Sequence, residues 1–247
     1  MFLKAALNGA RSTAYHPRVP ITAQQLAADA RAAVQAGADA IHLHVRGEDG
    51  METLAGDELA RTLAAVRASI PGTPVGVTSR LPIVGSPAER LRLARGWTAL
   101  PDFVSVNFDE EGSPELAELL LARGVGVEAG LADADAARAL LASGLSAHCL
   151  RILIEPREED VDAARATVSA IDGILSGAGA AAPRVVHGVD ATAWPLLNYA
   201  GGRGWGMRIG FEDTRDLMDG SPAADNAALV LAARALLSSP LCSVRGG

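Results

Sequence analysis

The chain has few cysteines, no excess of positive charge and no long apolar run, and each absence excludes a class of protein. Its 247 residues contain two cysteines, Cys149 and Cys242, which lie far apart and outside any metal-binding spacing. A chain of this length can bury a core without crosslinks, so a reducing, cytoplasmic location is the simplest expectation. The formal net charge of −7 argues against nucleic acid or an anionic membrane as the main partner. No apolar run approaches the roughly 20 residues of a membrane span, and Asn8 and Gly9 interrupt the first apolar stretch too early for a signal peptide.

Lysine is also nearly absent. Lys4 is the only lysine among the 22 basic residues. Lyases of the Schiff-base type need a lysine amine of lowered pKa in the pocket, and some two-metal hydrolases need a carboxylated lysine. Only Lys4 is available for either role, and it lies near the start of its segment. The composition therefore favours chemistry that does not depend on a lysine.

Eight short apolar runs alternate with longer helical patterns along the chain. This number of β-α units in about 250 residues is typical of a (β/α)8 TIM barrel, whereas a doubly wound open sheet would use fewer units or a second domain. No glycine-rich phosphate-binding pattern follows the first run. We therefore predict an α/β protein with one TIM-barrel domain over residues 1–247. The expected strands are Phe2–Leu7, Ala40–Val45, Pro74–Thr78, Phe103–Val106, Gly124–Glu128, Cys149–Ile154, Arg184–His187 and Gly206–Ile209.

Helix start signals follow several of these runs. Thr22 with Gln25, and Ser86 with Glu89, have the spacing of capping boxes. The pairs Ser113-Pro114 and Ser221-Pro222 are further expected caps. The low-complexity segment 177–182 is expected to form a loop before the seventh strand.

Polar residues occupy the inward parity of the predicted strands. On the second strand, Ile41, Leu43 and Val45 form the apolar set, which turns the alternate residues, His42, His44 and Arg46, into the barrel. On the fifth strand the same reasoning places Glu128 at the inward end. Further inward candidates are Asn8, Thr78, Ser105, Asn107, His187 and Arg208. A purely structural barrel would carry Val, Ile or Leu at such positions, so we predict an active site at the carboxyl ends of the strands.

The His42-Leu-His44 segment is the sharpest local signal. Two imidazoles at i and i+2 on a strand project from one face and can reach one divalent ion. Glu212 follows the eighth strand, which pairs with the first strand in a closed barrel, so it can converge with both histidines. Two histidines and one glutamate with an open fourth position is a catalytic zinc pattern. The alternative is that the histidines are ordinary hydrogen-bonding residues and that Glu212 and Asp213 cap the next segment or pair with Arg208 or Arg215.

These segments resemble the β-keto acid cleavage enzymes, whose founding activity is 3-keto-5-aminohexanoate cleavage. The resemblance covers nearly the whole chain and rests on four segments. They are Asn8-Gly-Ala10, Pro20-Ile-Thr22, Ala36-Gly-Ala-Asp-Ala-Ile-His-Leu-His-Val-Arg46 and Arg208-Ile-Gly-Phe-Glu-Asp-Thr214. It implies a reversible, zinc-dependent Claisen-type acyl transfer in which a β-keto acid and acetyl-CoA give acetoacetate and a new CoA thioester.

The resemblance also implies roles for individual residues. His42, His44 and Glu212 would bind zinc, and Asp213 with Arg208 would form the acid-base pair. Thr78, with or without Ser79, and Ser105 would hold substrate. Glu128 would be a carboxylate that either supports the residues in contact with the metal or substrate, or lies on the substrate side itself. We further expect Asn8, Asn107 and His187 to contact substrate, although an ordinary hydrogen-bonded role for His187 is equally compatible with the sequence.

Arg11 departs from the family pattern, because the founding activity uses a glutamate there to hold the substrate amine. An arginine cannot pair with an ammonium group, so we hypothesise a neutral or anionic substrate tail with Arg11 as its clamp. The alternative is that Arg11 turns to solvent or pairs with Asp109 or Glu110. No motif identifies the CoA-binding surface.

Two rival functions remain open at the level of sequence. An amidohydrolase-like zinc hydrolase would carry the His-X-His pair on the first strand, further histidines on strands five and six, and an aspartate on strand eight. A non-catalytic metal-binding or scaffold protein would not need the inward polar set. Small-molecule substrates and a homo-oligomeric state complete the expectations.

Overall fold

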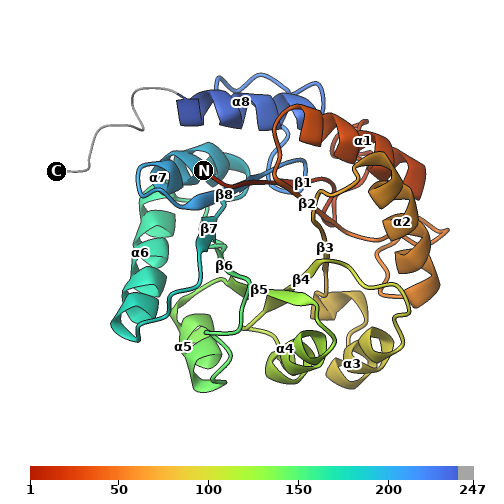
Figure 1. Cartoon of the computed structure of the whole chain (residues 1–247). Helices are drawn as coiled ribbons and strands as arrows, with labels where there is room; N and C mark the ends of the chain where they lie inside the picture. The colour runs from red at the N-terminus through yellow and green to blue at the C-terminus, as the bar shows by residue number, and fades with distance from the viewer. Residues whose placement is uncertain (239–247) are drawn as a thin grey trace.

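Eight parallel strands close into a barrel in the computed structural model, which describes residues 1–238 (Figure 1). Each strand pairs with the next, and the eighth pairs with the first. This arrangement confirms the predicted (β/α)8 barrel. The strands are β1 (Leu3–Ala6), β2 (Ala40–Leu43), β3 (Val75–Thr78), β4 (Phe103–Asn107), β5 (Gly126–Leu131), β6 (Arg151–Ile154), β7 (Arg184–Val186) and β8 (Gly206–Ile209).

A helix follows each strand and covers the outside of the barrel (Figure 1). The helices are α1 (Ala23–Gln35), α2 (Gly56–Ser69), α3 (Pro87–Arg95), α4 (Ser113–Ala122), α5 (Ala134–Ala142), α6 (Val161–Gly177), α7 (Ala193–Gly201) and α8 (Asn226–Ser238), with short 3-10 turns at Leu81–Ile83 and Asp190–Thr192. None of the helices in this described part of the chain combines the length and the apolar character needed to cross a bilayer.

The helix caps agree in part with the sequence signals. Thr22 and Gln25 form the predicted capping box of α1, and the Ser86 side chain accepts a hydrogen bond from the backbone N–H of Glu89 at the start of α3. The other two expected caps are wrong. The left-handed Gly112, at φ +72°, precedes α4, so Ser113 is already helical. Ser221 lies in a turn before α8, which begins only at Asn226.

Strand β5 begins and ends later than the sequence predicts. The backbone N–H of Val125 still donates to the carbonyl of Leu120 in α4, and Gly124 has φ +75°, so this turn belongs to the helix end. The strand runs from Gly126 to Leu131. Glu128 therefore lies within the strand instead of at its inward end.

An ion cluster lies inside the barrel. Lys4 donates to Glu128, and Arg151 Nε donates to the other carboxylate oxygen of Glu128 at 2.8 Å. The Lys4 and Glu128 side chains are completely buried, and the Lys4 amine lies 5.7 Å from the centroid of the Phe103 ring. Burial lowers the pKa of Lys4 to about 8, although the charge of Glu128 partly opposes it. Lys4 is thus a structural cation paired inside the barrel.

Asn226 joins the ends of the barrel where β8 meets β1. Its side-chain amide donates to the carbonyl of Leu7 at 2.8 Å and to Asp29 Oδ2 at 2.6 Å, and its Oδ1 accepts from the backbone N–H of Phe211 at 2.7 Å. One buried side chain of α8 therefore connects the segments after β1 and β8 with α1.

Candidate metal and substrate site

A cavity of about 670 Å³ opens at the carboxyl ends of the strands. This is the face on which TIM-barrel active sites lie. Ten of the predicted site residues line it, and they come from six of the eight βα units. They are Arg11, His42, His44, Thr78, Ser105, Asn107, His187, Arg208, Glu212 and Asp213.

Three other predicted site residues lie outside the cavity wall. Asn8 bonds to the backbone of His44 in both directions, accepting from its N–H at 2.8 Å and donating to its carbonyl at 2.9 Å. Ser79 donates to the carbonyl of Ser105 at 2.7 Å. Glu128 is held in the ion cluster with Lys4 and Arg151. All three therefore contact the protein itself, and Asn8 and Ser79 brace the strand ends that carry site residues.

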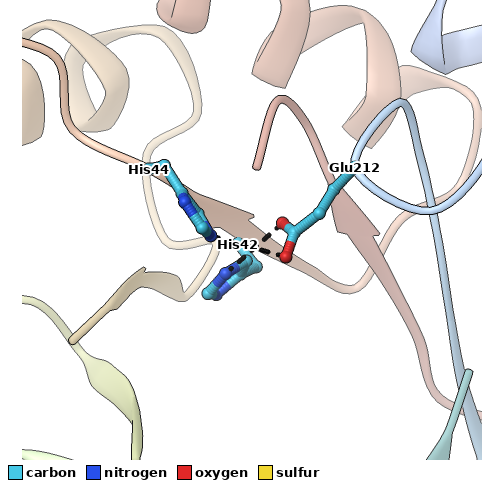
Figure 2. Close-up of side chains that lie close together, drawn as sticks. All are labelled: His42, His44 and Glu212. Atoms are coloured by element: carbon cyan, nitrogen blue, oxygen red, sulfur yellow. Dashed lines mark ion pairs between the residues drawn. The ribbon is translucent and has the colours of Figure 1, made fainter. Parts of the chain in front are cut away.

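His42, His44 and Glu212 converge in one group (Figure 2). One potential ligand atom from each residue lies within 4.8 Å of the others. Glu212 Oε2 is 3.5 Å from His42 Nε2, and Glu212 Oε1 is 3.4 Å from His44 Nε2. Gly9 makes this possible, because a Cβ at that position would overlap the Glu212 side chain as it crosses the end of β1.

The donor set fits a tetrahedral zinc ion. Ligand atoms about 2.0–2.1 Å from such an ion lie roughly 3.3 Å apart, close to the observed separations. His44 Nε2 and Glu212 Oε2 are buried and form no hydrogen bond within the described chain. Burial lowers the pKa of His42 well below its ordinary value, which favours the neutral imidazole that binds metals.

Glu52 orients one of the two imidazoles. Its Oε1 lies 2.5 Å from His44 Nδ1, so Nδ1 carries the proton and Nε2 points its lone pair toward the group. Burial by itself would lower the pKa of His44, but the carboxylates of Glu212 and Glu52 outweigh burial and raise it. Sequence reasoning missed Glu52, because it lies in a loop beyond the strand that carries the histidines.

Asp213 lies at the centre of a second buried network. Arg208 donates to both of its carboxylate oxygens, at 2.7 and 3.3 Å, and also contacts Glu212 Oε1 at 2.5 Å. His187 Nδ1 is 3.1 Å from Asp213 Oδ1. Burial would raise the pKa of Asp213, but the charges of Arg208 and His187 outweigh it and lower the pKa. Asp213 is therefore ionised and faces the cavity.

Glu155 extends this network to the mouth of the cavity. It directly follows β6, and its Oε2 lies 3.3 Å from His187 Nε2. Gly130 of the neighbouring β5 leaves room for the Glu155 side chain. A Cβ at Gly130 would lie only 2.5 Å from Glu155 Oε1 and 2.7 Å from Asn107 Oδ1. Sequence reasoning missed Glu155, although a carboxylate directly after a buried strand is a usable signal.

Arg11 is already paired at the rim of the cavity. It lies 3.2 Å from Asp190 Oδ2 and 4.1 Å from the Tyr15 ring centroid, and the Tyr15 hydroxyl donates to Asp190 Oδ1 at 2.9 Å. The alternative partners expected from the sequence are wrong, because Asp109 pairs with Arg157 and Glu110 pairs with Arg90.

The fold and the site together define a TIM-barrel protein with a polar cavity and a potential metal group at the carboxyl ends of its strands. The model of the β-keto acid cleavage enzyme family matches residues 1–240, and the chain belongs to that family.

Two curated relatives match short segments of the chain. A 3-keto-5-aminohexanoate cleavage enzyme from Fusobacterium nucleatum is 39% identical over 72 residues, which are 29% of this chain and 26% of that protein. A 3-oxoadipate:acetyl-CoA acetyltransferase from Cupriavidus necator is 40% identical over 57 residues, 23% of this chain and 20% of that protein. The matched segments thus span about a quarter or less of these relatives.

Solved structures support the fold. A ternary complex of ObcA with a C4-CoA adduct and oxalate superposes with a TM-score of 0.66 at 16% identity, covering 90% of this chain and 64% of that one. The 3-dehydroquinate dehydratase from Aquifex aeolicus gives a TM-score of 0.56 at 13% identity, covering 96% of this chain and 97% of that one. At such identities the likeness concerns the barrel alone.

Proposed function

We propose that this protein is a zinc-dependent acyltransferase that cleaves a β-keto acid with acetyl-CoA, giving acetoacetate and a new acyl-CoA. The convergence of His42, His44 and Glu212 beside the buried Asp213 carries the proposal. Membership of the β-keto acid cleavage enzyme family and the acetyl-CoA acetyltransferase named among the relatives support it.

The three ligand residues would hold zinc at the floor of the cavity. A bound zinc ion supplies a Lewis acid that polarises the keto group of the substrate. Because His44 is oriented by Glu52, and Glu212 by Arg208, the ligand atoms are positioned by the protein before the ion binds. This arrangement reduces the reorganisation that binding requires.

Asp213 is the proposed base. Its carboxylate takes a proton from the carbon between the keto and carboxylate groups, while Arg208 and His187 hold it in place. The resulting carbanion attacks the thioester carbonyl of acetyl-CoA, a carbon-carbon bond forms, and CoA leaves as the thiolate. The thiolate then attacks the original keto carbon, the older carbon-carbon bond breaks, and Asp213 returns its proton to the departing acetoacetate.

Thr78, Ser105 and Asn107 are the proposed substrate contacts on the opposite wall. They lie at or near the ends of β3 and β4, and all three line the cavity. Their hydroxyl and amide groups can donate to carboxylate or carbonyl oxygens of a bound acid. We propose that Asn8 and Ser79 act indirectly, by fixing the strand ends that carry His44 and Ser105.

Arg11 supports a substrate without an amino group. An arginine at the rim repels an ammonium tail, whereas a carboxylate tail could bind Arg11 only by displacing Asp190. Kinetics on a panel of β-keto acids test this point in the wild type and in Arg11→Ala. A strong preference for an amino-substituted acid that survives the substitution would contradict it.

Zinc analysis combined with an acetyl-CoA-dependent cleavage assay tests the whole proposal. His44→Ala should lose bound zinc and activity together, because it removes one of three ligands. His148→Ala, which changes an exposed histidine outside the cavity, serves as the matched control and should keep both. Full activity in His44→Ala would overturn the metal mechanism.

The hydrolase alternative lacks the required ligands. The pattern of amidohydrolase-like enzymes needs histidines on the fifth and sixth strands, and neither Gly126–Leu131 nor Arg151–Ile154 contains one. The His-X-His pair also lies on the second strand instead of the first. Neither observation favours that function.

A further inference from the structure

Four arginines contribute to the wall of the cavity: Arg11, Arg80, Arg157 and Arg208. Arg11 is paired with Asp190, Arg157 with Asp109, and Arg208 with both Glu212 and Asp213. Arg80 differs from the others. Within residues 1–238, its guanidinium makes no ion pair and donates no hydrogen bond, so no other group of the fold holds it by direct contact.

Hydrogen bonds hold the backbone at Arg80 in place, although its guanidinium has no such partner within residues 1–238. Its N–H donates to Thr78 Oγ1 at 3.2 Å, and the N–H of the next residue, Leu81, donates to Glu110 Oε2 at 2.9 Å. Glu110 is held in turn by the buried Arg90 at 2.5 Å. Arg80 therefore projects from a braced loop, and its position at the cavity does not depend on a flexible backbone.

Burial places Arg80 on the outer part of the wall. Thr78 is 2% exposed and lies deep beside the metal ligands, whereas Arg80, two residues further along the same loop, is half-buried. Arg80 follows β3, which pairs with β2, the strand that leads into His44, so it lies on the His44 side of the cavity. When a molecule binds at His42, His44 and Glu212, the end that points away from these residues would thus lie near Arg80.

The other side of the mouth carries the opposite charge. Glu155, Glu158 and Glu159 line the cavity on the loop that follows β6. An anionic group entering the cavity is repelled from these carboxylates and attracted to Arg80. A guanidinium can hold a carboxylate by two parallel hydrogen bonds, which an amine cannot do.

We propose that Arg80 binds the distal carboxylate of the substrate, which makes a β-keto dicarboxylate the preferred acid. This inference rests on the proposed function, because it concerns the tail of the acid that this reaction cleaves. Arg80, and not Arg11, is assigned to the tail because Arg11 would first have to release Asp190. The reacting end of the acid has its own partners in the deeper, buried part of the cavity.

Steady-state kinetics on a matched pair of acids tests the assignment. We compare 3-oxoadipate with 3-oxohexanoate, which has the same chain length and no distal carboxylate, in the wild type, Arg80→Ala and Arg157→Ala. Arg80→Ala should raise KM for 3-oxoadipate at least about tenfold, the size expected for a lost charge-assisted pair. Its KM values for 3-oxohexanoate and acetyl-CoA should stay within about twofold, and Arg80→Lys should recover part of the loss. Arg157→Ala, which changes a cavity arginine already paired with Asp109, should not affect this preference.

Direct binding separates this inference from the proposed reaction. Titration calorimetry of 3-hydroxyadipate and 3-hydroxyhexanoate, which cannot be cleaved, should show preference for the dicarboxylate in the wild type and none in Arg80→Ala. A protein without cleavage activity that keeps this preference would refute the proposed reaction and support the role of Arg80. Equal binding of both acids by the wild type would overturn the inference. It would also be overturned if Arg80→Ala raised KM only for acetyl-CoA, which would assign Arg80 to a CoA phosphate, or if Arg11→Ala alone removed the preference.

Discussion

At the scale of single residues, Glu52 shows how a side chain outside the candidate ligand group can orient one of its members. Its carboxylate fixes the proton of His44 on Nδ1 and directs Nε2 toward Glu212. Glu52→Gln keeps the size of the side chain but removes the charge that selects this tautomer. We expect zinc affinity to fall about 10- to 100-fold, the usual effect of losing such a partner.

Competition with a chromogenic chelator measures this loss directly. Glu48→Gln is a matched control, because Glu48 belongs to the same loop but is exposed. Circular dichroism should show that both variants keep the fold. Wild-type zinc affinity in Glu52→Gln would mean that the contact with His44 does not serve metal binding.

The sequence predicts that His42, His44 and Glu212 lie close together, because that proximity depends on strand parity and strand order. His42 and His44 follow from strand parity, and Glu212 follows from the closure of β8 on β1. Glu155 and the Lys4–Glu128 pair were not predicted. Lys4 and Glu128 are separated by 124 positions, and their contact depends on how strands stagger across the barrel interior, which parity along one strand does not specify.

At the scale of secondary-structure elements, the close packing of β3 against β4 depends on the absence of a side chain at Gly76. The Phe103 ring of β4 lies over Gly76 and occupies the space where a Cβ would be. Both residues are buried in the barrel, so the ring has little room to move. Gly76→Ala should therefore lower the free energy of unfolding by about 1–3 kcal/mol or more through overpacking.

Urea unfolding at equilibrium checks this prediction. Gly173→Ala provides the comparison, because Gly173 lies in α6, is exposed and has open space around its Cβ position. That substitution should raise stability by about 0.5–1 kcal/mol, since alanine is the better helix former. Equal stability of the two variants would contradict the packing argument for Gly76.

Element boundaries were predicted less accurately than element types. All eight strands and the caps at Thr22 and Ser86 were predicted, because apolar periodicity and side-chain capping are local. The start of β5 was missed because the C-terminal turn of α4 takes Gly124 and Val125. That competition between a helix end and a strand start is decided by hydrogen bonds, which the apolar pattern does not report.

At the scale of the whole molecule, one partly buried carboxylate, Asp29 of α1, contacts Asn226 of α8 where the barrel closes. Burial raises the pKa of Asp29 to about 6, although the hydrogen bond from Asn226 opposes the rise. The folded state therefore binds more protons than the unfolded state between roughly pH 4 and 6. The stabilisation by protonated Asp29 is complete below this window and is lost as the pH rises through it.

Asp29→Asn should remove this dependence while keeping an oxygen that accepts from Asn226. We expect the variant to gain stability relative to the wild type as the pH rises from 4 to 7, by about 1–3 kcal/mol. Thermal or urea unfolding at several pH values measures the difference. A difference that does not change with pH would show that the pKa of Asp29 is not raised.

The sealed position of Lys4 has a chemical consequence for a protein proposed to handle acyl-CoA. Thioesters acylate exposed lysine amines without any enzyme, and a protein that works among them accumulates such adducts on its surface. Here the single ε-amine is completely buried and already donates to Glu128, and all other basic side chains that carry a permanent charge are guanidinium groups. The folded chain therefore presents no lysine for spontaneous N-acylation by its own proposed substrate or product.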